Sequence, residues 1–122
     1  MYIFYMSIPQ IFVLCCTEII GDFALKEYAN NRGGIKMLSL GILGYIGVII
    51  SLIIALQGSS ILMVNSAWDG MSALLESSAA IIILGERFDH YLQYVGLCFI
   101  ITGIYLLKVP WKKAQPFYIP SL

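Results

Sequence analysis

Charged residues are scarce in this sequence. Only 11% of its 122 residues are Asp, Glu, Lys or Arg, whereas a soluble domain usually contains about 25%. The apolar share is 60% and the mean hydropathy is +0.88. So few charges do not cover a water-facing surface, and an ordinary soluble globular domain is therefore nearly excluded. Because Lys+Arg and Asp+Glu both number 7, the concentrated basic charge that nucleic-acid binding needs is missing too.

Motifs for catalysis and for cofactor binding are also missing. The sequence has no Gly-rich phosphate loop and no Ser/His/Asp arrangement that suggests a nucleophile. Its three cysteines lie in apolar stretches without metal-ligand spacing, and its one histidine has no second ligand nearby. We therefore expect neither an enzyme nor a site for a cofactor or metal.

Long apolar segments are what the sequence has instead. They run over about residues 3–25, 37–56, 61–84 and 91–107. About 20 apolar residues suffice for a helix to cross a bilayer, and these segments lack the alternation of β-barrel strands. We predict an all-α integral membrane protein, with four transmembrane helices in one domain over residues 1–109. An extended Pro-rich tail is expected over 110–122, and Asp89 is expected to cap the last helix.

The basic residues leave the membrane orientation undecided. With four crossings, three lysines lie on one side and four basic residues on the other, and this bias is what normally sets topology. A chain that inserts both ways up can form an antiparallel dimer, a geometry found in transporters. We therefore expect the chain to lie in the lipid bilayer as a dimer. The partner is either a second copy in antiparallel orientation (a homodimer) or a paralogue (a heterodimer).

Two acidic residues lie inside the segment over 3–25. Glu18 and Asp22 are four residues apart and share one helix face. Carboxylates at bilayer depth usually face a bundle interior or a water-filled cavity. Because apolar surroundings disfavour the charged form, Glu18 is predicted to hold either a proton or a cation; the alternative is a glutamate bonded across helices for stability. For Asp22 we favour an ion pair with Lys26, one turn further.

A polar stripe is predicted on the helix over 61–84. Asn65, Asp69, Ser72 and Glu76 are spaced close to whole helical turns, and Trp68 lies beside them. The stripe either lines a pathway or packs against a partner by polar contacts.

Glycines mark the expected helix contacts. Gly41, Gly44 and Gly47 form a small-residue strip that favours close helix packing. Gly96 and Gly103 are seven residues apart and share a face that suits a helix–helix contact in a dimer. These five positions are predicted to serve packing and dimerisation.

Four parts of the chain resemble motifs of the small multidrug resistance family, within the drug/metabolite transporter superfamily. They are Thr17-Glu18-Ile19-Ile20-Gly21 with Leu25-Lys26, Asn65-Ser66-Ala67-Trp68-Asp69-Gly70, Gly85-Glu86-Arg87-Phe88-Asp89, and the pair Gly96 and Gly103. The resemblance spans about residues 15–108 with nearly constant spacing.

The resemblance implies an antiparallel dimer that exchanges protons for organic cations. It places Glu18 on the proton- and substrate-binding glutamate, Trp68 on the substrate-stacking tryptophan, and Tyr45 on a pocket-lining tyrosine. The glycine at position 21 resembles the residue found there in the branch of the family that takes bulky aromatic and quaternary cations. Asp69 is similar to an acidic residue in one subunit of the spermidine exporters.

Some positions depart from the family pattern. Asn65 stands where the motif has tyrosine, Ser72 replaces a glycine, and Asp22 and Glu76 are additional acids. Extra carboxylates suit a polyvalent cation such as a polyamine. We predict a proton-coupled antiporter that exports small organic cations of the quaternary ammonium or polyamine type. The alternative is a non-transporting multi-pass membrane protein that serves as a structural component of a larger assembly.

Overall fold

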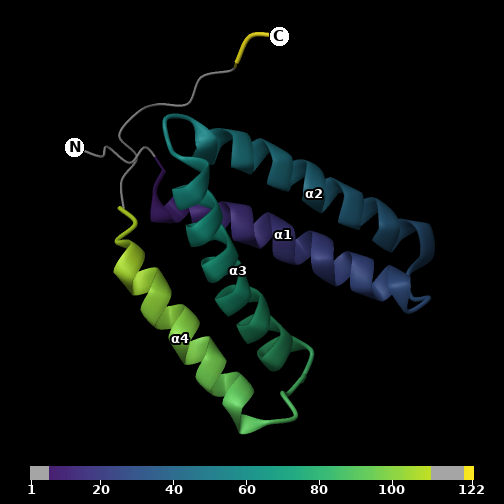
Figure 1. Ribbon diagram of the computed structural model, residues 1–122. Helices are drawn as coiled ribbons and strands as arrows, with labels where there is room; N and C mark the ends of the chain where they lie inside the picture. The colour runs from purple at the N-terminus through teal and green to yellow at the C-terminus, as the bar shows by residue number, and fades with distance from the viewer. Residues whose placement is uncertain (1–5, 111–119) are drawn as a thin grey trace.

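The computed structural model describes residues 6–110 and 120–122, and this part of the chain forms four α-helices and no strands (Figure 1). The helices are α1 (Ile8–Ala29), α2 (Gly34–Leu56), α3 (Ile61–Ile83) and α4 (Tyr91–Leu107). The all-α prediction is confirmed for the described residues. Most of the predicted tail lies outside them.

Two helices, α1 and α2, are long and apolar enough to cross a membrane. Only 28% of the most apolar stretch of α1 and 17% of that of α2 are buried, which is unlike the core helices of a soluble protein. On α2 the exposed side chains include Ile42, Leu43, Ile46, Ile49 and Ile50, and neighbouring exposed apolar side chains of this kind mark a surface that contacts lipid or protein. Two helices therefore have the length and composition of a membrane span, while insertion into a membrane and four crossings stay predictions.

The first helix begins at Ile8, later than the predicted residue 3, and ends at Ala29. The main-chain N–H of Ser7 donates to Oε1 of Gln10 at 3.0 Å, which closes the start of the helix. Pro9 is tolerated in the first turn because its missing N–H has no intrahelical partner there. Polar residues at the other end extend α1 by one turn beyond its apolar segment.

The cap of α4 differs from the prediction. His90, rather than Asp89, precedes the helix, and its Nδ1 accepts the main-chain N–H of Leu92 at 3.1 Å. Oε1 of Gln93 accepts the main-chain N–H of His90 in return, also at 3.1 Å. The Asp89 cap is therefore wrong: α4 begins at Tyr91, where the predicted range begins, and the residue directly before it is His90.

Glycines bring α1 and α2 into close contact along their lengths (Figure 1). A Cβ atom placed on Gly44 would lie 2.7 Å from the Cα of Gly21. A Cβ placed on Gly47 would lie 3.1 Å from Cγ2 of Thr17, and one placed on Gly41 would meet the side chain of Leu25. The small-residue strip therefore packs α2 onto α1 within the same chain.

The fourth helix is the least covered. It packs along α3, where a Cβ on Gly70 would lie 2.9 Å from Cγ1 of Ile104. No residue of α4 is buried. A Cβ atom placed on Gly96 or on Gly103 would meet no neighbouring heavy atom within 4 Å, so the face expected to dimerise is open.

Helices α3 and α4 run at an angle to the α1–α2 pair (Figure 1), and α3 contacts α1 along its middle as well as at the end where α1 begins. There the N–H of Ile8 donates to the carbonyl oxygen of Pro110 at 2.8 Å, and that of Met6 donates to Oγ of Ser59 at 2.9 Å. The core includes Ile11, Leu14 and Cys15 of α1, Val48 and Ala55 of α2, and Val64 and Ala67 of α3.

Candidate functional site

Glu18 lies between α1 and α3 with both carboxylate oxygens hydrogen-bonded. The indole Nε1–H of Trp68 donates to Oε2 at 2.5 Å, and the hydroxyl of Ser72 donates to Oε1 at 3.0 Å. Both donors come from α3, and because they are four residues apart they present one face to α1. The two bonds hold the carboxylate in one orientation, at a half-buried position.

Two further carboxylates lie beside Glu18. One oxygen each of Glu18, Asp22 and Glu76 lie within 4.8 Å of one another. We call these three residues the carboxylate cluster. The hydroxyl of Tyr45 donates to Oδ1 of Asp22, so α2 contributes to the site as well. Like charges this close disfavour three ionised carboxylates unless a proton or a cation lies among them.

Within residues 6–110 and 120–122, no basic side chain forms an ion pair with the cluster. Lys26 pairs with Glu86 from the α3–α4 connector, so the predicted pair with Asp22 is replaced. Arg32 pairs with Glu27, with 2.9 Å between Nε and Oε2. The negative charge of the cluster is therefore left without a basic partner in the described part of the chain.

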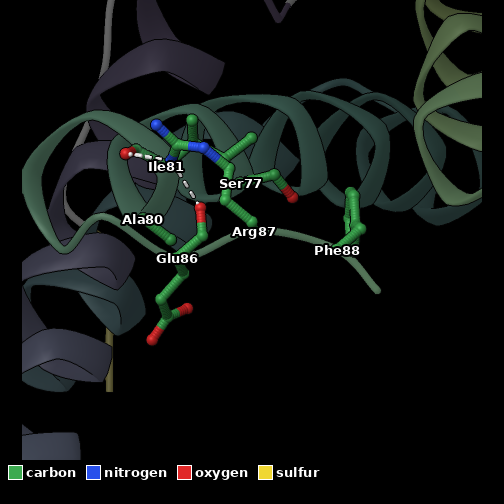
Figure 2. Close-up of a pocket in the computed structure, with 6 residues that line it drawn as sticks. All are labelled: Ser77, Ala80, Ile81, Glu86, Arg87 and Phe88. Carbon is green, nitrogen blue, oxygen red and sulfur yellow. Dashed lines mark hydrogen bonds between the residues drawn. The ribbon is translucent and has the colours of Figure 1, made fainter. Parts of the chain in front are cut away.

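Arg87 serves the end of α3. Its Nη1 donates to the carbonyl oxygens of Ile81 at 2.9 Å and Glu86 at 2.7 Å. Figure 2 shows the guanidinium over the last turn of the helix, while the Glu86 carboxylate points the other way. Helix C-termini leave carbonyl oxygens unpaired, and Arg87 supplies hydrogen-bond donors to two of them at the end of α3. The carboxylate of Glu86 pairs with Lys26 instead.

An open hollow of about 270 Å³ borders the cluster near the last turns of α1 and α3. Its lining comprises Asp22, Phe23, Lys26, Glu76, Ser77, Ala80, Leu84 and Glu86. Asp22 and Glu76 thus face open space, whereas Glu18 is not part of this lining. The hollow has room for several water molecules or for an amine headgroup.

The structure divides the predicted stripe of α3. Ser72 lies in the contact with α1 and Glu76 in the cluster, whereas Asn65 and Asp69 are exposed and bond each other, with 3.2 Å between Nδ2 and Oδ2. Because α3 crosses α1 at an angle (Figure 1), the residues that face α1 shift round α3 along its length. Of the predicted site residues, Glu18, Trp68, Tyr45 and Glu76 come together; Asn65 and Asp69 lie apart.

Three residues of the site region, Asp22, Ser72 and Glu86, are not among the predicted site residues. Asp22 shares a helix face with Glu18, which was the signal for it, but the sequence favoured an ion pair with Lys26. Ser72 was noted as part of the stripe, and its spacing from Glu76 was the signal that could have placed it in the site. Glu86 had no such signal, because its partner Lys26 is 60 residues away in the sequence.

We expect Ser72→Ala to lower the free energy of unfolding by about 1.5 kcal/mol, because a hydrogen bond to a charged group is lost. Titration with sodium dodecyl sulfate in mixed micelles, followed by circular dichroism, measures this change. Ser78→Ala, on the exposed side of α3, is the control and should change stability by less than about 0.5 kcal/mol. Equal losses in both variants would show that the Ser72 bond contributes nothing.

Neither family models nor curated proteins nor solved structures yield a match to the chain. The described residues form an all-helical fold with two helices long and apolar enough to cross a membrane, and with a carboxylate cluster between α1 and α3. The resemblance to the small multidrug resistance family stays a prediction from the sequence.

Proposed function

We propose that this chain is a multi-pass integral membrane protein that exports small organic cations in exchange for protons. The observation that carries the proposal is the carboxylate cluster, in which three acids lie within 4.8 Å of one another. No Lys or Arg side chain of residues 6–110 neutralises it. Such a cluster binds a proton or a cation, and since one excludes the other, movement of the two becomes coupled.

The residues around the cluster fit cation recognition. Glu18 is the central group in the proposal, because two hydrogen bonds already orient its carboxylate. Trp68 contacts it directly, and an indole ring face attracts an organic cation. Asp22 and Glu76 add two acids next to the hollow, which supports a substrate with more than one positive charge, of the polyamine type, beside quaternary ammonium compounds.

The proposal includes a dimer. No residue of α4 is buried, and Gly96 and Gly103 look onto open space. Small residues on a membrane helix permit close approach of a second helix. A second copy packed there would cover the face, and the nearly even distribution of basic residues favours an antiparallel arrangement. In such a pair the exposed Asn65 and Asp69 would be available to a shared cavity.

Transport is tested in liposomes that contain the purified chain and have an acidic interior. If the proposal is right, protons leaving the liposomes drive uptake of radiolabelled spermidine or tetraethylammonium, several-fold above protein-free liposomes. A proton ionophore should abolish the uptake. If neither cation is taken up or bound under any pH gradient, the proposal is wrong and the structural role in an assembly becomes the better prediction.

A further inference from the structure

Lys26 and Glu86 line the same hollow as two members of the carboxylate cluster. The hollow brings Lys26 together with Asp22 and Glu76, and the Lys26 ammonium group is paired with the Glu86 carboxylate. Asp22 and Lys26 are four residues apart on α1, a spacing at which a carboxylate and an ammonium group normally meet. The ammonium group of Lys26 could therefore reach the carboxylate of Asp22, but it is paired with Glu86 instead.

The pair that holds Lys26 is exposed and easily exchanged. The side chains of Lys26 and Glu86 are 42% and 47% exposed, and ion pairs at such positions contribute little to stability. The effect of the pair is that the Lys26 ammonium group neutralises Glu86 rather than a carboxylate of the cluster. Without Glu86, Asp22 is the acid one turn away on the same helix face.

We infer that Glu86 is a positioning residue that keeps the ammonium group of Lys26 out of the carboxylate cluster, where it would compete with a cationic substrate. The inference rests on the proposed function. The substrate's ammonium groups and Lys26 need the same carboxylate oxygens, so a tethered amine at Asp22 acts as an internal competitor. Because the connector between α3 and α4 carries Glu86, any movement of this connector would release the competitor.

Among the residues that line the hollow, Lys26 is the only base. Arg87 donates to carbonyl oxygens at the end of α3, and Arg32 pairs with Glu27. Glu27 is therefore a matched control: it is an acid at the same end of α1, paired with a base, but it lines a different, apolar cavity. Its neutralisation changes the net charge by the same amount without releasing Lys26.

The experiment measures the dissociation constant of spermidine by calorimetry, using the full chain in detergent micelles at low salt. We expect Glu86→Gln to weaken binding about fivefold, a modest coupling between competing groups. Lys26→Gln in the otherwise unaltered chain should change binding less than about twofold, since its ammonium group is already neutralised. The double variant should bind like the unaltered chain, as should E86D and E27Q.

Non-additivity separates competition from a general effect of charge. If Lys26→Gln strengthens binding equally with and without Glu86, the effect is long-range electrostatics and the inference is overturned. It is overturned as well if E86Q binds normally or if the double variant stays weak. Glu86→Ser replaces E86Q if that variant does not elute from a size-exclusion column like the unaltered chain. If the unaltered chain binds neither spermidine nor tetraethylammonium, the proposed function itself fails.

Discussion

Glu18→Gln is expected to abolish coupled binding, with cation affinity lowered at least about 30-fold. The substitution keeps the size of the side chain and removes its charge. One of the two donors that face Glu18, from Trp68 and Ser72, would then meet an amide NH₂ group, which accepts no hydrogen bond. Removing one partner from a partly buried charged contact costs about 2–5 kcal/mol, and each 1.4 kcal/mol is about tenfold in affinity.

Proton release on cation binding measures this effect in weakly buffered solution. The unaltered chain should release protons when tetraethylammonium or spermidine is added, and E18Q should release none. Glu18→Asp is the conservative control: it keeps the charge, so some proton release should survive although the shorter side chain lies further from α3. Proton release by E18Q at the unaltered level would place the exchange on other groups and would contradict the role given to Glu18.

Gly44→Ala is expected to lower the free energy of unfolding by about 3 kcal/mol, the upper range for overpacking a close contact. The added Cβ would lie 2.7 Å from both the Cα and the N of Gly21, and 3.1 Å from the carbonyl oxygen of Thr17. These are main-chain atoms of α1, so no side chain can rotate away. The two helices must separate, and Tyr45 must move relative to Asp22.

Gly103→Ala is the matched control for this prediction. It makes the same change within a helix, but apart from the adjoining main chain of α4 no described heavy atom lies within 4 Å of the new Cβ. The protomer should keep its stability or gain up to about 1 kcal/mol, because alanine favours the helix over glycine. Denaturation of both variants by sodium dodecyl sulfate at high dilution, followed by circular dichroism, compares them. Equal destabilisation would contradict the close contact of Gly44 with Gly21.

Much of the fold could be predicted from the pattern of apolar residues. Long apolar segments with polar connectors allow few solutions other than helices, because main-chain polar groups must be paired within each segment. Helix ends were less predictable, since they depend on single bonds. The bond from Ser7 N–H to Gln10 marks a start of α1 later than the predicted one, and His90 replaces Asp89 as the cap of α4 although that helix begins where it was predicted.

The site could be predicted in part. Residues four apart share a helix face whatever surrounds them, and so the pairing of Glu18 with Asp22 on one side of α1 needed no tertiary information. The strip of Gly41, Gly44 and Gly47 pointed to a close helix contact for the same reason, although its partner helix was unknown.

The sequence alone therefore determined where the helices lie along the chain and which acids share a face on each helix. The tertiary structure decided which faces meet. It joined Glu76 to Glu18 and Asp22, moved Lys26 from Asp22 to Glu86, and left Asn65 with Asp69 outside. The physical reason is that helical period sets the angle of a side chain about its own axis, whereas crossing angle and rotation come from packing between helices.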